Sequence, residues 1–363
     1  MNFKELIINI WKFYLFLKVL IFAKKGYKKN SPRIFYGGAR KGDIGGPVVK
    51  IKKLSKYFCE GNTTFNIAYL TSNNSFLSKR TLDLLNQKKI PIILNQNGVY
   101  YPAWYKGNYK EKNYINSYYY KKADYVLYQS SFCKRASEKF LGKRSGPGEI
   151  LYNAVDTKKF HPFKKLSNRD FTFLITGNIR KNNNYRISSV LFALKGIIDE
   201  YKNINININI NIAGYIEDKN YFRKIINELN LENNVNFLGK YSQDNAAEIY
   251  RTADAYITMS YNDNCPSAVI EAMSSGLPIL FSESGGIPEL VTKECGIGIS
   301  VTENWNKVII PKVEDIQIGM HQIIEKRNEM SKASRLRAIN YFDIKIWINR
   351  HREIFENLLN QNY

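Results

Sequence analysis

The sequence predicts an α/β protein with two parallel-sheet domains. Its 363 residues suffice for two domains, and a hydrophobic content of 44% is enough for two buried cores. Short apolar runs alternate with longer segments of helical spacing, and this alternation is typical of parallel sheets flanked by helices. Four scattered cysteines and three histidines indicate neither a disulfide framework nor a zinc site, and they fit a reducing cytoplasm.

The clearest unit is a strand, a helix and a second strand within residues 255–281. The runs 255–259 and 278–281 have the length and apolarity of buried strands, while Pro266 and Gly276 are typical start and stop signals of a helix. In a parallel sheet the N-terminus of such a helix lies at the carboxyl end of a strand. Ligands bind there, and the free N–H groups of the helix favour an anion.

Two acids lie near this helix start. Asp263 is in the preceding loop, and Glu271 is about one and a half turns into the helix. We expect both carboxylates to border one crevice, where one could hold ribose hydroxyls and the other the hydroxyls of a second sugar. A diphosphate would then lie between them at the helix start. The alternative is that both acids are solvated charges on an ordinary strand–helix unit.

At these residues the sequence resembles the retaining family-4 glycosyltransferases, which have the GT-B fold. The spacing D-x7-E from Asp263 to Glu271 is similar to the family's E-x7-E signature with the first Glu replaced by Asp. The segments 271–280 (EAMSSGLPIL) and 284–290 (SGGIPEL) also match, within a resemblance that covers residues 33–363. It implies two Rossmann-like domains facing across a cleft, with a C-terminal helix that crosses back to the first domain.

The resemblance also implies the chemistry. Glu271 is expected to bind the ribose hydroxyls of a nucleotide-sugar donor, and Asp263 to contact the transferred sugar and stabilise its oxocarbenium-like charge. The sugar is expected to keep its configuration, and no metal or other cofactor is expected. Further donor contacts in this half are expected from Asn264, Cys265, Ser267, Ala268, Gly285 and Gly286.

The first, acceptor-side domain is expected over residues 31–160 and opens with a strand at 33–36. Five glycines follow the strand in the loop 37–47, before the next helix. Glycine permits close approach of the backbone to a phosphate. A loop of this kind touches the donor diphosphate in family-4 enzymes, which implies contacts at Gly45 and Gly46, although a plain tight turn would give the same pattern.

Further strands of this domain are predicted at 65–70, 90–94 and 123–129. The loop after the second of these should face the ligand-binding edge of the sheet, and its Gln96 and Asn97 could bind acceptor hydroxyls or simply form a turn. Family-4 enzymes often place a histidine in this half of the cleft. Here no histidine occurs before His161, so that role is absent or falls to one of these two amides.

The donor-binding domain is expected over residues 161–340. The segment 149–162 before it resembles the family motif N-G-V-D-x-x-x-F-x-P, in which Asn153 is expected to fix the turn. The alternating Asn-Ile run 203–212 predicts a strand despite its low complexity. Helical spacing of apolar residues in the tail predicts a docked crossover helix at 341–363.

The sequence departs from the family where the donor phosphates are bound. Family-4 enzymes place an Arg and, five residues later, a Lys after the first strand of this domain, and those positions are Asn178 and Asn183 here. A leaving nucleoside diphosphate needs positive charge. Arg180, Lys181 and Arg186 could supply it by proximity, or they could be solvated loop charges.

The net charge of +22 is concentrated in the first half of the chain. Residues 1–160 contain 30 Lys and Arg against 9 Asp and Glu, whereas residues 161–363 contain 24 against 23. Such asymmetry favours a polyanionic partner, and a lipid-linked acceptor at an anionic membrane surface fits better than nucleic acid. The alternative is that the charge serves solubility.

Residues 1–30 are predicted to form an apolar and basic helix. The run 6–23 contains Asn9, Lys12 and Lys18, which make a bilayer-spanning segment costly, and no cleavage site of a secretory signal follows it. We expect a helix in the membrane interface, with the protein in the cytoplasm on the inner face of the membrane. The alternative is a helix docked on the protein's own core.

Together these features predict a retaining glycosyltransferase that acts in the assembly of a cell-surface polysaccharide or glycolipid. One alternative is another enzyme of the same fold, such as an epimerase, phosphorylase or nucleotide-sugar hydrolase, which would turn over the donor without an acceptor. The other is a catalytically degenerate basic module that binds anionic lipid or nucleic acid. The departures at Asp263, Asn178 and Asn183 favour this last alternative.

Overall fold

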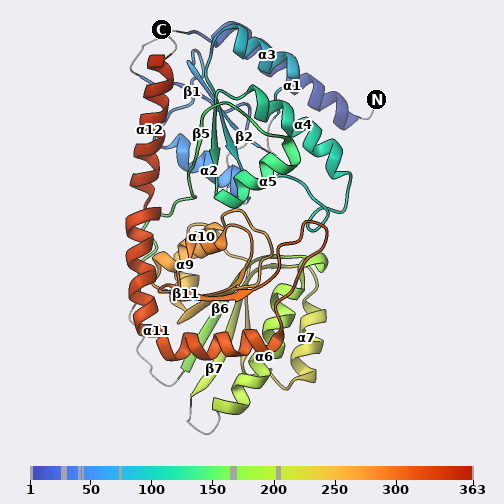
Figure 1. The fold of residues 1–363 in the computed structure, drawn as a ribbon, viewed down its shortest axis with the longest axis vertical. Helices are drawn as coiled ribbons and strands as arrows, with labels where there is room; N and C mark the ends of the chain where they lie inside the picture. Colours follow the sequence, from blue (N-terminus) through green and yellow to red (C-terminus); the bar gives the residue numbers. More distant parts are fainter. Residues whose placement is uncertain are drawn as a thin grey trace. The chain divides into compact units, whose positions relative to one another are not determined.

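The computed structural model has two compact units, each built on its own parallel sheet (Figure 1). Unit 1 is Met1–Tyr152 with Lys345–Tyr363, and unit 2 is Asn153–Ile344. The structure describes residues 3–25, 31–39, 42, 45–72, 76–163, 170–201 and 206–361. Parts of three predicted segments therefore lie outside the described residues: 26–30 after the first helix, 40, 41, 43 and 44 in the glycine-rich loop, and 203–205 in the Asn-Ile run.

Unit 1 has a five-stranded sheet whose strands follow the chain order β1-β2-β3-β4-β5. Its strands are β1 (Ile34–Phe35), β2 (Ile67–Thr71), β3 (Ile92–Gln96), β4 (Tyr125–Tyr128) and β5 (Gly148–Ile150). Its helices are α1 (Phe3–Phe22), α2 (Gly46–Ser55), α3 (Lys79–Gln87), α4 (Tyr109–Lys122), α5 (Ser131–Leu141) and α12 (Ile344–Gln361). Ser78, Asn108 and Ser130 begin α3, α4 and α5 by accepting a backbone N–H three residues later.

Unit 2 has a six-stranded sheet in the order β11-β10-β9-β6-β7-β8. Its strands are β6 (Asp170–Ile179), β7 (Asn207–Ile216), β8 (Val235–Gly239), β9 (Ala255–Thr258), β10 (Ile279–Glu283) and β11 (Gly296–Ser300). Its helices are α6 (Tyr185–Tyr201), α7 (Lys219–Glu228), α8 (Ala246–Arg251), α9 (Ser267–Ser274), α10 (Ile287–Leu290) and α11 (Val313–Phe342), with a 3-10 turn at Lys181–Asn183. The strand expected from the Asn-Ile run is confirmed as β7, and its isoleucines Ile208, Ile210 and Ile212 are buried in the core of this unit.

The C-terminal helix packs on unit 1, as a crossover helix does. Its His351 is fully buried, with Nε2 3.1 Å from the hydroxyl of Tyr69 in β2, and burial lowers the pKa of this imidazole to about 3. Arg350 donates to both carboxylate oxygens of Glu149 in β5, at 2.8 and 2.6 Å. A neutral histidine in the core and an ion pair at its edge therefore hold α12 on the sheet.

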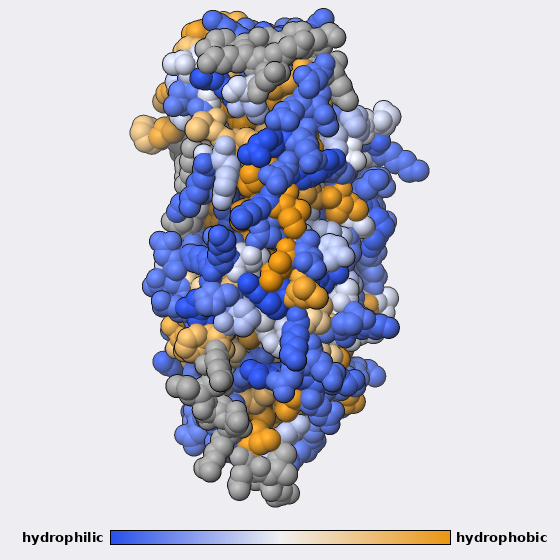
Figure 2. Space-filling model, turned by 90° about the vertical axis from the view of Figure 1, so that its left-hand side faces the viewer, coloured by the Kyte–Doolittle hydropathy of each residue, from blue (hydrophilic) through white to orange (hydrophobic). Residues whose placement is uncertain are grey.

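The tail is broken into two helices at Asp343, which has an extended backbone. The Val155 N–H donates to the Phe342 carbonyl, and the Ile344 N–H donates to the Val155 carbonyl, both at 2.9 Å. The chain entering unit 2 thus pairs with the chain leaving it. Figure 2 shows apolar side chains in small groups between hydrophilic ones.

Candidate active site

The strand order of unit 2 reverses between β6 and β9. Numbered within the unit, the strands lie in the order 6-5-4-1-2-3, which is the order of a doubly wound Rossmann sheet. In such sheets ligands bind outside the carboxyl ends of the strands, at the point of reversal. The loops that leave β6 and β9 therefore mark the candidate site of this unit.

Asp263, in the loop after β9, lies at this point together with Arg186. Burial raises the pKa of the Asp263 carboxyl above its ordinary value, and the charge of the Arg186 guanidinium acts in the opposite direction. Arg186 is in the first turn of α6, where a terminal guanidinium nitrogen lies 3.7 Å from the place that a Cβ atom on Gly177 of β6 would take. A carboxylate from the loop after β9 and a guanidinium from the start of α6 thus lie near the strand reversal, close enough for their charges to interact.

Several buried polar atoms in these segments lack a hydrogen-bond partner within the described part of the chain. Two of them are Nε of Arg186 and Oδ1 of Asn264. Because buried polar groups are nearly always hydrogen-bonded, each atom indicates a ligand or an ordered water that binds there. The first is a donor and the second an acceptor, so phosphate oxygens and sugar hydroxyls both fit.

The other two predicted phosphate-binding cations, Arg180 and Lys181, are exposed on the loop after β6. The Arg180 N–H donates to Oδ1 of Asn183 at 2.6 Å, and Nδ2 of Asn183 donates to the carbonyl of Asn178 at 3.3 Å. The asparagines at the family's Arg and Lys positions therefore brace this loop. Of the three predicted cations, Arg186 is the one whose charge acts on the Asp263 carboxyl.

The predicted glycine pair Gly285 and Gly286 positions the loop of Asp263. Gly285 has φ of +67°, and a Cβ atom on it would lie 2.4 Å from the Asp263 carbonyl oxygen, so only glycine fits. The Gly286 N–H donates to that same oxygen at 2.7 Å and is therefore engaged within the loop. On the other side, the Asn153 side chain donates to the carbonyl of Cys265 at 2.6 Å.

Helix α9 begins a few residues after Asp263. The Cys265 N–H donates to Oδ1 of Asp263 at 3.2 Å, and the Cys265 side chain is buried. Ser267 and Ala268 form the first turn and are half-buried. Because the first N–H groups of a helix have no acceptor within it, this turn offers donors and a positive dipole end beside the Asp263 loop.

Glu271 is buried in the second turn of α9, where its Oε2 accepts a hydrogen bond from the Tyr250 hydroxyl at 3.0 Å. Burial raises the pKa values of Tyr250, Tyr241 and Tyr256, and the Glu271 charge raises them further. Thr176 of β6 adds a hydroxyl 2.9 Å from that of Tyr256. The carboxylate thus lies among hydroxyl groups from four elements, and the sequence analysis did not identify these tyrosines as site residues.

In unit 1, the predicted acceptor-side residues Gln96 and Asn97 lie at the end of β3. The Gln96 side chain is fully buried and donates to the Gly98 carbonyl at 2.7 Å. The Asn97 side chain donates to the Ser72 carbonyl at 3.2 Å and accepts from Nε2 of Gln129 at 2.7 Å. Both amides therefore belong to an internal network at the carboxyl edge of this sheet.

A buried lysine completes that network. Nζ of Lys50 in α2 donates to Oδ1 of Asn95 at 2.7 Å and to Oδ1 of Asn97 at 3.1 Å. The sequence analysis did not single it out. Gly45 precedes α2 with φ of +96°, and at Gly46, its first residue, no described atom lies within 4 Å of the place of a Cβ atom.

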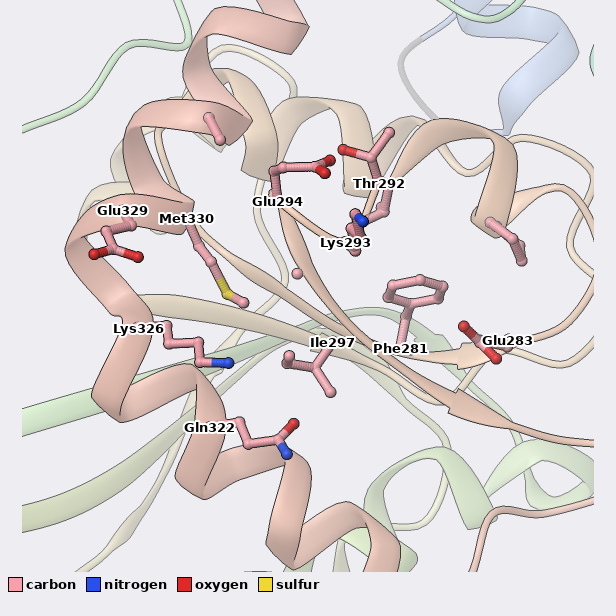
Figure 3. Close-up of a pocket in the computed structure, with 15 residues that line it drawn as sticks. Phe281, Glu283, Thr292, Lys293, Glu294, Ile297, Gln322, Lys326, Glu329 and Met330 are labelled. Carbon is pink, nitrogen blue, oxygen red and sulfur yellow. The ribbon is translucent and has the colours of Figure 1, made fainter.

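A cavity of about 840 Å³ lies at the β11 edge of the sheet in unit 2 (Figure 3). Phe281 and Met330 supply apolar surface, while Lys326 of α11 and Glu283 of β10 place opposite charges at its rim. None of the predicted site residues lines it. Within the described residues there is also no cluster of three or more His, Cys, Asp or Glu side chains suited to a metal ion.

Two archaeal proteins are similar to this chain in sequence. An uncharacterized glycosyltransferase of Methanocaldococcus jannaschii, MJ1069, is 26% identical over 258 residues, which is 68% of this chain and 62% of the relative. A second from the same organism, MJ1059, is 25% identical over 59% of this chain and 57% of its own length. The matches thus span about three fifths of these relatives.

Solved structures agree on the fold. A sucrose-phosphate synthase from Thermosynechococcus elongatus has a TM-score of 0.63 at 13% identity and covers 87% of this chain and 78% of its own. Anabaena HepE, solved in complex with UDP, has a TM-score of 0.62 at 16% identity over 86% of this chain and 82% of its own. Both comparisons support the GT-B fold.

A family model covers the unit in which the candidate site lies. The model for glycosyl transferases group 1 matches residues 156–337, which is half of the chain. The matched range contains Asp263, Arg186 and Glu271, and also the strand reversal near which the first two lie. A sequence match over half of the chain, on a sheet with the expected topology, places this protein in the family of group 1 glycosyl transferases.

Proposed function

We propose that this protein is a metal-independent, retaining hexosyltransferase that uses a nucleotide-sugar donor. The observation that carries the proposal is the position of Asp263 at the strand reversal of unit 2, within reach of the charge of Arg186, which lowers the pKa of its carboxyl against the effect of burial. The helix that follows carries Glu271 in its second turn. The starts of α6 and α9 and the loop between β9 and α9 thus offer a cation for a diphosphate and carboxylates for two sugars.

The roles follow from where charge develops during transfer. As the bond between the anomeric carbon and the phosphate oxygen breaks, the nucleoside diphosphate gains negative charge, which Arg186 and the first turn of α9 would stabilise. The sugar gains positive charge, which the ionised Asp263 carboxylate would stabilise. The acceptor hydroxyl oxygen bonds to the anomeric carbon from the same face, and its proton passes to the departing phosphate.

Glu271 is the proposed ribose ligand, which favours a ribonucleotide donor. Its Oε2 is fixed by Tyr250, so the carboxylate is oriented before any ligand binds. Two related folds, Anabaena HepE and the pneumococcal O-GlcNAc transferase GtfA, were solved with UDP. We therefore propose UDP as the carrier.

The acceptor is proposed to be a lipid-linked glycan at the inner face of a membrane, in the assembly of a cell-surface polysaccharide or glycolipid. The support is charge: residues 1–160 hold 30 basic against 9 acidic residues. Lipid-linked intermediates present phosphate groups in a surface that is itself anionic, and a basic unit attracts both.

Thermal unfolding with UDP, GDP, ADP and dTDP tests the donor site. A nucleotide at about 100 times its dissociation constant stabilises by roughly 2.7 kcal/mol, a shift of several degrees for units of this size. We expect UDP to raise the melting temperature of the wild type and of Glu228→Ala, an exposed glutamate of α7, but not of Glu271→Ala. If no nucleotide shifts the wild type, the donor site is not functional and the basic binding module becomes the better description.

A second assay separates transferases from other enzymes of the same fold. Labelled UDP-sugars are incubated with the protein, with and without a lipid extract as acceptor. Sugar incorporated into lipid supports the proposal. Rapid donor turnover that needs no acceptor would instead identify an epimerase, a phosphorylase or a hydrolase.

A further inference from the structure

α1 presents an unusual apolar surface to solvent. Eleven of its large apolar side chains are exposed, among them Phe3 (76%), Phe13 (62%), Ile10 (59%), Ile21 (58%) and Ile7 (51%). Contiguous apolar surface of this extent is rare on soluble proteins and marks a site of interaction. The helix lies in unit 1, the unit that carries the excess of basic residues.

The two halves of α1 have different environments. From Phe3 to Tyr14, every residue whose side chain is described is exposed except Lys12, which is half-buried. In the second half, Leu15 and Val19 are buried against unit 1. Nζ of Lys88 also donates to the Leu20 carbonyl at 2.7 Å and fixes this half to the unit.

Whatever covers the exposed half of α1 must contact apolar side chains on all sides of the helix, and not on one face alone. Residues 6, 7, 8, 10, 11, 13 and 14 are all exposed and apolar, and successive residues of a helix point in different directions. A groove on another protein, or a second copy of α1, would cover one face of the helix and leave the rest in water. A lipid phase covers every face at once.

The length of the exposed half of α1 limits how deeply it can insert into a bilayer. Phe3–Tyr14 is 12 residues long, which is about 18 Å of helix against a hydrocarbon core of about 30 Å. Within the described residues, no helix combines the length and the apolarity needed to cross a bilayer. Insertion is therefore confined to one leaflet and its interface.

Two further features match a membrane interface. The rings of Trp11 and Tyr14 stack with centroids 5.3 Å apart, and such aromatic side chains favour the level of the lipid headgroups. Lys24 and Lys25 are exposed just after the helix, where they would meet anionic headgroups.

We propose that residues Phe3–Tyr14 of α1 insert into one leaflet of an anionic membrane, while the second half of α1 stays docked on unit 1. The segment is thus a membrane anchor built into the first helix of the chain. It gives a mechanism to the membrane location in the proposed function, but lipid binding itself needs neither donor nor acceptor.

Vesicle sedimentation of the full chain tests this. The vesicles are pure phosphatidylcholine or an equimolar mixture with phosphatidylglycerol, and the test variant is Ile7→Glu with Ile10→Glu. The control is Ile318→Glu with Ile346→Glu, isoleucines of similar exposure (56% and 45%) in α11 and α12. We expect the wild type and the control to sediment with the mixed vesicles, and the α1 variant to partition at least about tenfold less, since each isoleucine contributes substantial transfer energy.

Each other outcome overturns the proposal. Equal binding of the α1 variant would place the lipid contact elsewhere, and failure of the wild type to bind either vesicle would exclude a membrane anchor. A wild-type dimer in solution that the α1 variant disperses, without lipid binding, would identify a second copy as the occupant. Unfolding with UDP, run on the same samples, shows whether the variants are folded and reports separately on the donor site.

Discussion

Replacing Tyr250 by phenylalanine removes the hydroxyl that bonds Glu271 in the proposed ribose site and that also interacts with Thr176 and Tyr241. The Tyr250 side chain is fully buried, and its hydroxyl donates to Oε2 of Glu271 at 3.0 Å. Its ring packs edge to face on Phe160, with centroids 5.7 Å apart, and a phenylalanine ring can keep that contact. Burial raises the pKa of the Tyr250 phenol above its ordinary value, which favours the protonated form that donates this hydrogen bond.

The expected loss in the free energy of unfolding is large for the removal of a single oxygen atom. A hydrogen bond to a charged group contributes about 1.5–3 kcal/mol to the free energy of unfolding. For a domain of about 150–250 residues, a loss of about 2 kcal/mol lowers the melting temperature by roughly 4–8 °C. UDP affinity should fall as well, because Glu271 loses the group that orients its carboxylate.

A double-mutant cycle makes the test specific. Tyr250→Phe, Glu271→Gln and the double variant are unfolded in urea, with Tyr221→Phe, an exposed tyrosine of α7, as the matched control. We expect the double variant to lose about 1–2 kcal/mol less than the sum of the two single losses. Strictly additive losses, or a Tyr250→Phe protein that melts and binds UDP like the control, would refute the assigned hydrogen bond.

Three more predictions follow from the Asp263 site. Arg186→Ala should lower kcat/KM by about 100-fold, whereas Arg180→Ala should stay within a few-fold of wild type, and the reverse order would refute the assignment of the phosphate cation. Because the pKa of Asp263 is raised, we expect kcat/KM to begin to fall, as the pH is lowered, at a higher pH than an ordinary aspartate of pKa about 4 would cause. A kcat/KM that stays constant down to about pH 4 would refute this expectation. Gly285→Ala should destabilise by at least about 2 kcal/mol in urea unfolding, because its Cβ would lie 2.4 Å from a carbonyl oxygen.

The order of strands and helices could be predicted because the signals are local. Alternation along the Asn-Ile run is enough to predict β7, and Pro266 with Gly276 is enough to delimit α9 approximately. The break at Asp343 could not be found in the same way. It depends on pairing with Val155, almost two hundred positions away in the chain, and the sequence near the break reads as helix.

The same difference between local signals and long-range contacts explains which site residues could be predicted. Asp263 and Glu271 belong to one strand–helix segment, so their spacing alone places them together. Tyr241, Tyr250 and Tyr256 reach the Glu271 region from a loop, a helix and a strand, and no spacing rule links these elements. The tyrosines became visible only once the sheet order was known.

The loss of the family's Arg and Lys positions is consistent with a site that still binds a diphosphate. Asn178 and Asn183 shape the loop, while the cation that we propose for the diphosphate is Arg186 in the helix that follows. In the free protein the charge of that guanidinium lowers the pKa of the Asp263 carboxyl, whereas burial raises it. In the proposed site a donor diphosphate would bind the guanidinium, and the transferred sugar would lie beside the carboxylate. We therefore propose that the donor binds between the two charges, because its diphosphate needs the cation and its sugar needs the anion.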